Sequence, residues 1–427
     1  MRSVERPSIY YGWWVLAAAA LTEMLSIGST SYAAGLFVLP LQNELSLSRA
    51  AANSSIPIAF AGGALLSPLV GYLLDRLPIQ WVIALGAVSL GLGFAAIAVT
   101  SSIPLMVLAL FLPVAFGAVA IGPLTTSTLA SRWFYRRRGR ALGAAALATS
   151  AGGLVVVPLL SVGIQRFGWR PALFGEGMLI VAIVMAVTLL VIRSGPADLH
   201  MEGHPENAGR PPVDMPRAQQ EGPEGGAVVL WRYRDMLTEL NFWAVAIALG
   251  SIDGIAQAII VSLVPYGTGL GYSAVSAALL IDAFSILTAL AKIVSGLLSD
   301  IIERRVIMLA STLAMIAALL VFITYSSYPM LILGCSLAGA SLGGILPSSS
   351  AIVAACFGSP SFGRVMGAMY VIILGSSIVS AWFVGAIFDR TGNYNAAFLT
   401  FLAIALGAAI ATLLVRPPQA QLQSQSA

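Results

Sequence analysis

Long apolar segments recur along the whole 427-residue chain and constrain its fold more than any other feature. A helix needs about 20 apolar residues to cross the hydrocarbon core of a bilayer. Soluble domains contain about a quarter charged residues, whereas this chain contains 9%. We therefore expect an all-α integral membrane protein, surrounded by the lipid bilayer. The first apolar segment, from Tyr11 to Pro40, is too long for the apolar region of a cleaved signal peptide.

The apolar segments predict twelve transmembrane helices in two sets of six. They cover residues 12–40, 50–74, 80–99, 104–132, 139–165 and 170–193 in the first set, and 241–269, 274–299, 305–325, 328–357, 362–388 and 394–415 in the second. Between the sets, the segment from Ser194 to about Val228 is rich in Pro, Gly and Glu and should be a flexible linker. The following "LWRYRDMLTELNFW" predicts a short interfacial helix. The expected division is an N-terminal lobe at 1–193, this linker and helix at 194–240, a C-terminal lobe at 241–415 and a tail at 416–427.

The distribution of arginine predicts the orientation in the membrane. Cytoplasmic loops of membrane proteins are enriched in Arg and Lys. With both chain ends in the cytoplasm, 17 arginines lie inside, and the four outside are Arg49, Arg166, Arg170 and Arg390. We therefore expect both termini to be cytoplasmic, and the membrane to be a bacterial inner membrane.

An internal repeat relates the two sets of helices. "GYLLD" from Gly71 and "GLLSD" from Gly296 close the second span of each set. "GRALG" from Gly139 and "GRVMG" from Gly363 open the fifth span of each set. The two offsets, 225 and 224 residues, agree with each other. Because parallel six-helix repeats are one architecture of secondary transporters, the pattern predicts two pseudo-symmetric six-helix lobes.

Several short motifs resemble those of one transporter family. "GYLLDR", ending in Asp75 and Arg76, resembles the loop motif between spans two and three of the major facilitator superfamily, although the usual downstream basic residues are absent before Trp81. "WFYRRRGRALGAAALATSAGG" in span five, together with "YYGWW" and "MLTELNFW", resembles the monocarboxylate transporters and their oxalate:formate-antiporter-like relatives. The resemblance implies the major facilitator fold and a gating contact between helix ends on the cytoplasmic side. The residues we assign to gating are Asp75, Arg76, Asp300, Arg140 and Arg364.

Small residues in span five are interpreted as helix-packing positions. Gly139, Gly143, Ser150 and Gly153 recur at helical spacing. Small side chains allow helix backbones to approach closely within a membrane.

Four charged residues lie deep within the predicted spans, namely Glu23 in span one, Asp253 in span seven, and Asp282 and Lys292 in span eight. A charge at the bilayer centre costs about 2.5–3.5 kcal/mol on insertion scales, so each of the four is a candidate functional residue. Lys292 is also the one lysine of the chain. It belongs to a polar series with helical spacing, formed by Asp282, Ser285, Thr288, Lys292, Ser295 and Ser299. Such a polar face predicts that span eight lines a wet central cavity.

Two interpretations of Lys292 remain open at this point. One is a structural ion pair with Asp253 or Glu23, and the other is a cation that binds an anionic substrate. The monocarboxylate transporters resemble "LTALAKIVSGLLSD" in span eight, with an arginine at the position of Lys292 and an aspartate at that of Thr288. Their substrate-linked lysine in span one has no counterpart here, because Leu36 falls near that place. The resemblance implies an anion-binding role for Lys292 and a proton carrier at some other acid.

The expected function is secondary active transport of a small organic monoanion, a monocarboxylate, coupled to protons by alternating access. The candidate substrate-binding residues are Lys292, Ser285, Thr288, Ser295 and Tyr370. The candidate proton-coupling residues are Asp253, Glu23 and Asp282. Span eleven contains no basic residue after Arg364, and one cation favours a monoanion over a dianion. Export of drugs or lipophiles and organic-anion exchange without proton coupling are alternatives.

We expect no enzymatic activity, no cofactor, no metal ion and no nucleic-acid partner. The spans contain no set of nucleophile, base and acid and no metal-ligand cluster. His200 and His204 stand four residues apart in the linker and are interpreted as solvated loop residues, since two ligands at this spacing are a weak metal signal.

Overall fold

The computed structural model describes residues 10–46, 54–199, 201, 204, 206 and 231–416, and every regular element within them is a helix. We call the helices up to residue 190 the first bundle. Its members are α1 (Gly12–Ile27), η1 (Gly28–Tyr32), η2 (Ala33–Phe37), α2 (Val38–Leu45), α4 (Ser55–Arg76), α5 (Ile79–Val99), α6 (Ile103–Ala109), η3 (Leu110–Val114), α7 (Ala115–Ala120), α8 (Pro123–Trp133), α9 (Arg138–Phe167) and α10 (Trp169–Leu190).

The second bundle follows the short helices η4 (Pro196–Leu199) and α11 (Tyr233–Leu237). Its members are α12 (Leu240–Gly269), α13 (Ala274–Leu298), α14 (Arg304–Thr324), α15 (Tyr328–Phe357), η6 (Ser359–Ser361), α16 (Phe362–Thr391) and α17 (Asn395–Leu414). The predicted interfacial helix corresponds to α11, which is shorter than the motif that predicted it.

The first predicted span is interrupted rather than continuous. The π-helix η1 and the 3₁₀-helix η2 separate α1 from α2. Gly28, Ser29 and Thr30 of this segment all have low helix propensity, and single π turns inside helices occur frequently at functional sites. Among the described residues, eleven other helical stretches are long and apolar enough to cross a membrane, and one of them, Ile103–Trp133, is also interrupted, by the π-helix η3 and at Ile121 and Gly122. They correspond to the remaining eleven predicted spans.

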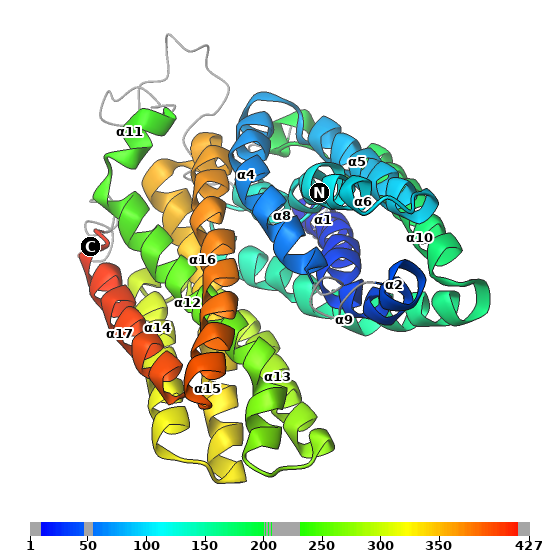
Figure 1. Cartoon of the computed structure of the whole chain (residues 1–427). Helices are drawn as coiled ribbons and strands as arrows, with labels where there is room; N and C mark the ends of the chain where they lie inside the picture. Colours follow the sequence, from blue (N-terminus) through cyan, green and yellow to red (C-terminus); the bar gives the residue numbers. More distant parts are fainter. Residues whose placement is uncertain are drawn as a thin grey trace, which may run out of the picture.

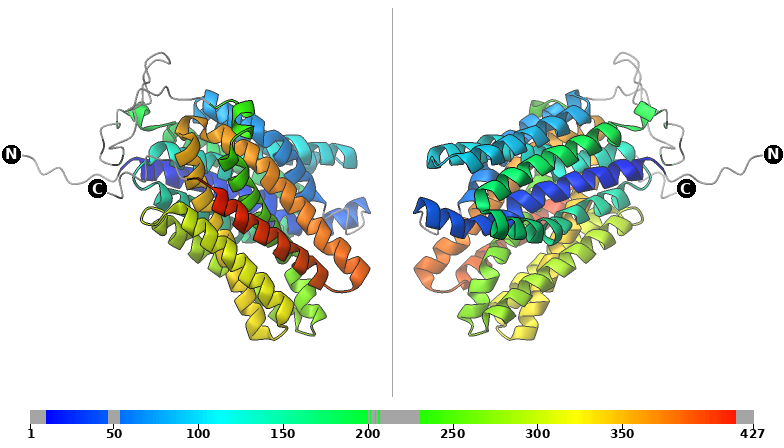
Figure 2. Two further views of the ribbon diagram at one scale, coloured as in Figure 1. Left: turned by 90° about the vertical axis from the view of Figure 1, so that its left-hand side faces the viewer. Right: turned by 90° about the vertical axis from the view of Figure 1, so that its right-hand side faces the viewer.

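The two bundles meet along two pairs of helices. α4 lies beside α16, and α9 lies beside α13. In Figure 1 the first bundle extends to the right and the second to the bottom of the view, so the bundles share only part of their length. Figure 2 shows from the sides that α1 begins and α17 ends on the same side of the molecule.

Glycines set the distance between the bundles at both helix pairs. A Cβ atom added to Gly143 of α9 would lie 2.8 Å from the Cα atom of Gly296 on α13. A Cβ atom added to Gly71 of α4 would lie 2.2 Å from the carbonyl oxygen of Gly363 on α16. These four residues belong to the repeated sequence motifs, so the repeat marks the places where the two bundles touch.

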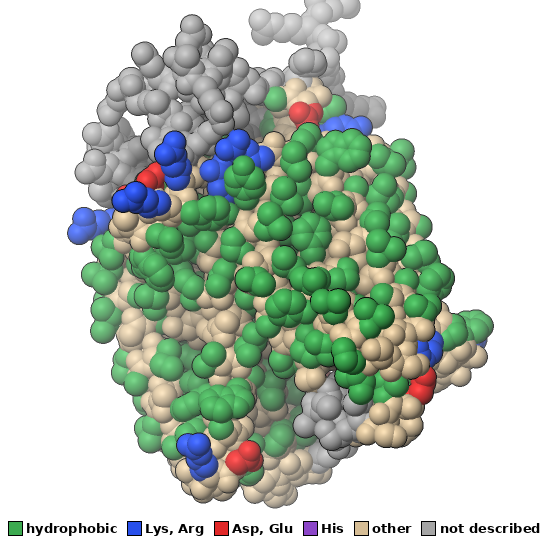
Figure 3. Space-filling view, turned by 45° about the horizontal axis from the view of Figure 1, so that its top comes forward, with side chains coloured by type: hydrophobic (Ala, Val, Ile, Leu, Met, Phe, Trp, Pro, Cys, Tyr) green, Lys and Arg blue, Asp and Glu red, His purple; other side chains and the backbone are tan. Residues whose placement is uncertain are grey.

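Charged and apolar side chains occupy different parts of the surface. Figure 3 shows apolar side chains across the middle of the visible face and basic side chains gathered mainly near one end. We call the end that carries Asp75, Arg136, Arg140 and Asp300 the arginine-rich face. The other end, which carries the ion pair of Glu44 with Arg170 at 2.7 Å, is called the opposite face. The apolar middle is the surface expected to contact lipid.

Candidate functional site

Lys292 connects the two bundles from the C-terminal half of α13, six residues before the helix ends at Leu298. Its side chain is 4% exposed. The ammonium donates a hydrogen bond to the Thr149 hydroxyl and another, at 3.4 Å, to Ser150 Oγ, and both acceptors lie on α9 of the first bundle. The contacts of the lysine across the interface are therefore neutral hydroxyl groups.

Two acids lie near enough to Lys292 to act on its charge, namely Glu23 of α1 and Asp253 of α12. Glu23 is 2% exposed, and the polar side chain that acts on its carboxyl group is the Thr126 hydroxyl of α8. Asp253 Oδ2 accepts a hydrogen bond of 2.6 Å from Ser377 Oγ of α16. Among the ion pairs that the described residues form, none includes Lys292. The ammonium therefore has two acids in its electrostatic surroundings and forms a direct ion pair with neither.

Tyr370 of α16 belongs to the same group of side chains. It is partly buried, and the charges of both Glu23 and Asp253 act on its phenol group. Of the residues selected from the sequence, Lys292, Glu23, Asp253 and Tyr370 thus come together from four helices, α13, α1, α12 and α16. Helices of both bundles contribute, as the midplane site of a two-repeat transporter requires.

The polar series on α13 divides into a buried part and an exposed part. The Thr288 hydroxyl donates to the carbonyl oxygen of Phe284 at 2.8 Å. Ser295 Oγ has two carbonyl acceptors, Lys292 at 3.3 Å and Gly343 of α15 at 3.4 Å, so both hydroxyl groups already have backbone partners. Ser285 and Asp282 are exposed. Asp282 lies ten residues from Lys292, about 15 Å along the helix axis. The structure therefore does not bring Asp282 to the lysine.

Three hydroxyl residues of the site, Thr126, Thr149 and Ser150, carry little signal in the sequence. Thr149 and Ser150 lie in an Ala- and Gly-rich stretch, where small residues indicate helix packing. Packing does bring α9 against α13 at Gly143, and the same close approach puts the two hydroxyls within reach of the ammonium. The available clue was the pair of adjacent hydroxyl residues in an otherwise apolar segment.

Asp75 joins the bundles at the beginning of α16. Its carboxylate accepts hydrogen bonds from the backbone N–H groups of Gly363 at 3.1 Å and Arg364 at 3.0 Å. Arg364 Nε adds a third contact at 3.2 Å, and Arg132 lies 3.8 Å away. A carboxylate is favoured at a helix N-terminus because that end carries unpaired N–H groups and partial positive charge. Arg76 is exposed and lies over the Tyr72 ring, with 5.3 Å between its Cζ atom and the ring centroid.

Asp300 makes the equivalent contact at the beginning of α9. It accepts from the N–H groups of Gly139 at 2.8 Å and Arg140 at 3.2 Å, and Arg140 Nε lies 3.3 Å away. Burial raises the pKa of the Asp300 carboxyl above its ordinary value, although these donors and charges act in the opposite direction. The two aspartates, related by the sequence repeat, thus each hold the N-terminus of a helix in the other bundle.

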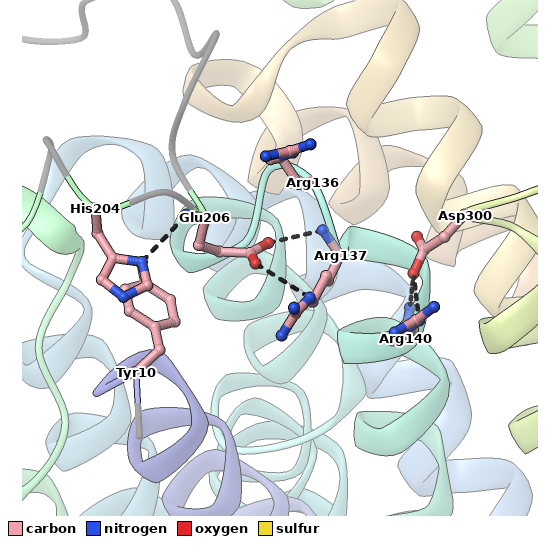
Figure 4. Close-up of a pocket in the computed structure, with 7 residues that line it drawn as sticks. All are labelled: Tyr10, Arg136, Arg137, Arg140, His204, Glu206 and Asp300. Atoms are coloured by element: carbon pink, nitrogen blue, oxygen red, sulfur yellow. Dashed lines mark hydrogen bonds and ion pairs between the residues drawn. The ribbon is translucent and has the colours of Figure 1, made fainter. Parts of the chain in front are cut away.

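A pocket of about 420 Å³ lies beside the Asp300 contact on the arginine-rich face (Figure 4). Glu206 pairs with Arg137 at 3.7 Å, and His204 stacks on Tyr10 with 4.4 Å between ring centroids. The residues that line this pocket are Tyr10, Arg136, Arg137, Arg140, His204, Glu206 and Asp300. Because Lys292 is not among them, the pocket is separate from the buried group of charges.

The sequence assigned no metal role to the two linker histidines. His204 Nδ1 accepts a hydrogen bond from the backbone N–H of Glu206, while His200 lies outside the described residues. Within the described part of the chain, no group of three or more His, Cys, Asp or Glu residues is arranged to hold a metal ion.

Comparison with known proteins identifies the family. A family model of the Major Facilitator Superfamily matches residues 19–281 and 246–427. The chain belongs to the Major Facilitator Superfamily. It is similar to mouse monocarboxylate transporter 12, with 22% identity over 403 residues that cover 91% of this chain and 82% of that protein. It is also similar to the oxalate:formate antiporter of Oxalobacter formigenes, with 23% identity over 265 residues that cover 61% of this chain and 57% of that protein.

A solved structure of a variant of the Escherichia coli fucose:proton symporter shares the fold, with a TM-score of 0.69 and 15% identity over 95% of this chain and 100% of that chain. These findings confirm the predicted family and the all-α, multi-pass membrane fold. The relatives are transporters, which agrees with the prediction that the protein is not an enzyme. The protein is a Major Facilitator Superfamily transporter.

Proposed function

We propose that the protein transports a small organic monoanion, a monocarboxylate, together with protons, and that Lys292 binds the anionic group. The observation that carries the proposal is a buried ammonium, 4% exposed, whose direct contacts across the bundle interface are the hydroxyls of Thr149 and Ser150. Hydroxyl groups do not neutralise a buried positive charge, whereas a carboxylate does. The similarity to transporters named for monocarboxylates and for oxalate and formate supports the same substrate class.

The structural alternative for Lys292 is a permanent ion pair with Glu23 or Asp253. The described residues form no such direct pair, and Asp253 instead accepts from Ser377. Both acids nevertheless act on the lysine electrostatically. A substrate anion at Lys292 would therefore alter the charge around both acids, which links anion binding to proton binding. Glu23 and Asp253 are our candidates for the coupled proton, and Asp282 is disfavoured by its distance.

The membrane orientation is part of the proposal. With the arginine-rich face in the cytoplasm, the loop arginines follow the positive-inside rule. The Asp75 and Asp300 contacts then close the cytoplasmic side of the interface between the bundles. We propose that the substrate enters from the opposite face and that release requires both contacts to open. The orientation places both termini in the cytoplasm and suits a bacterial inner membrane.

Uptake into proteoliposomes tests the role of Lys292. Lys292→Gln should abolish uptake of a labelled monocarboxylate, and Lys292→Arg should retain part of it, because only the latter keeps the charge. Arg390→Gln is the matched control. It removes an exposed arginine from the last turn of α16, away from Lys292, and should transport normally. Normal uptake by Lys292→Gln would refute the anion site and leave the lysine a structural role.

A second measurement tests proton coupling. Glu23→Gln or Asp253→Asn should abolish accumulation driven by a pH gradient while leaving exchange of labelled for unlabelled substrate. Asp282→Asn should accumulate substrate as the unaltered protein does. If both variants near the lysine accumulate substrate normally, the transporter exchanges anions without using either acid for protons.

A further inference from the structure

Glu176 of α10 is a partly buried residue whose carboxyl group is buried, and it takes no part in the group around Lys292. Both of its carboxyl oxygens are buried, and neither forms a hydrogen bond with any described residue. The polar group that acts on the carboxyl is the Ser29 hydroxyl of η1, which is itself buried without a hydrogen bond of normal geometry. Two unpartnered polar groups from different helices thus face each other inside the first bundle.

No charged side chain of the described residues compensates Glu176. α10 packs against α5, α9 and α1. α5 contains no ionisable residue, and the nearest charge on α9 is Arg166 at its end. Glu23 of α1 lies six residues before Ser29, about 9 Å along the axis. Arg170 of α10 itself is bound to Glu44 and to the carbonyl oxygens of Ala98 and Thr100. Burial and the Ser29 hydroxyl are the influences that act on the carboxyl.

An ionised carboxylate in these surroundings would be costly. Glu176 lies seven residues into α10, about 10 Å from the start of the helix at the opposite face. Removing a carboxylate from water without donors or a counter-ion is strongly unfavourable, and such groups become neutral instead. A bound metal cation is a poor alternative, because hard cations need about six oxygen ligands and one hydroxyl faces this carboxyl.

We propose that Glu176 and Ser29 form a proton-binding site in the first bundle, separate from Lys292, and that its occupancy is coupled to the position of η1. The carboxyl group carries the proton, and the Ser29 hydroxyl is the polar group that faces it. The site does not depend on the anion proposed for Lys292, so it can be tested without a substrate.

The surroundings of Ser29 explain why the proton and the helix segment are coupled. η1 interrupts the first membrane helix and lies next to α9, where a Cβ atom added to Gly28 would lie 2.9 Å from the carbonyl oxygen of Gly152. On the other side, Ser29 covers the carboxyl of Glu176. Because Ser29 faces the carboxyl, a movement of η1 away from Glu176 would open a path for water to accept the proton. Proton release is therefore proposed to accompany a shift of the outer part of the first helix.

Infrared difference spectroscopy on the full chain in lipid vesicles detects the proton directly, because a protonated carboxyl has a separate carbonyl stretching band. We expect a band at neutral pH that is lost in Glu176→Gln and is shifted, not lost, in Ser29→Ala. Glu23→Gln is the matched control, since it removes another acid of this bundle that lies within a membrane helix and should leave the Glu176 band in place. If the Glu176→Gln spectrum matches that of the unaltered protein at every pH, Glu176 is ionised and the proposal is wrong.

Hydrogen exchange tests the link to η1. When alkaline pH removes the Glu176 band, backbone amides of residues 28–37 should exchange faster in the unaltered protein but not in Glu176→Gln. Unchanged exchange in this segment would refute the coupling. Replacing potassium with sodium at constant ionic strength should leave the band unchanged, and loss of the band in sodium would show a metal-cation site in place of the proton site. None of these measurements includes an organic anion. Their outcomes therefore test the Glu176 proposal independently of substrate uptake by the Lys292 variants.

Discussion

Gly143→Ala should push the two bundles apart at the arginine-rich face. The added Cβ atom would lie 2.7 Å from the carbonyl oxygen of Lys292 and 2.8 Å from the Cα atom of Gly296. Both neighbours are backbone atoms, so neither can turn aside, and α9 and α13 must separate by about 0.7 Å to restore normal contact. Overpacking of this kind costs about 1–3 kcal/mol. The closed arrangement should therefore lose about 5- to 150-fold in population relative to arrangements in which the bundles are apart.

Gly163→Ala is the matched control on the same helix. Its Cβ atom would meet only the Cβ atom of Ala172, at an ordinary 3.6 Å. Both substitutions gain a similar helix-propensity term of about 1 kcal/mol, so the difference between them isolates the contact between the bundles.

Pulsed electron paramagnetic resonance measures the separation between spin labels on the two bundles. Leu77→Cys and Ile301→Cys suit the labels, because these residues are 43% and 71% exposed and follow Asp75 and Asp300. The free cysteines Cys335 and Cys356 are first replaced by Ser. Gly143→Ala should broaden the distance distribution toward longer values, and Gly163→Ala should not. Identical distributions for the two variants would show that the glycine contact does not control closure.

Three further outcomes follow from the contacts. Asp75→Asn should increase the same label distance more than Asp300→Asn. The first variant leaves Arg364, which is 7% exposed, without its acid, and an unpaired buried charge costs about 3–5 kcal/mol. The arginine that pairs with Asp300 is 44% exposed, and exposed pairs contribute about 1 kcal/mol or less, so equal shifts would contradict this reasoning. Hydrogen bonds from Arg170 and then Trp169 hold the pKa of Glu44 below its ordinary value, so this contact stabilises the fold above about pH 4.3 and is lost as the pH falls through the lowered pKa. Trp169 emission should change over that acid range and stay constant in Glu44→Gln. In competition assays lactate or benzoate should outcompete oxalate by about tenfold, or roughly 1.4 kcal/mol, because one cation serves the site; stronger inhibition by oxalate would point to a second cation.

The sequence alone determined the class of fold, the number of membrane segments and the repeated motifs that the structure places where the bundles touch. Length and apolarity are sufficient for the first two, since a bilayer leaves a spanning segment few options besides a continuous helix. Gly71, Gly143, Gly296 and Gly363 belong to the motifs that the repeat aligns, and Gly143 is also predicted as a packing position because close helix approach requires small residues. The same reasoning selected Lys292, because an ammonium in an apolar segment is too costly to be incidental.

The tertiary structure decided which polar groups meet. Helical spacing places Asp282 and Lys292 on one face, but about 15 Å separates them along the axis. The acids that act on the lysine are instead Glu23 of α1 and Asp253 of α12. Ser150 is predicted from the sequence as a packing residue and Thr149 is given no role, and only the contact of α9 with α13 makes them partners of the ammonium. The break at Gly28–Tyr32 and the placement of Ser29 near the Glu176 carboxyl also depend on neighbouring helices. Local sequence sets which face of a helix is polar, whereas the partner of each polar group depends on helices distant in the chain.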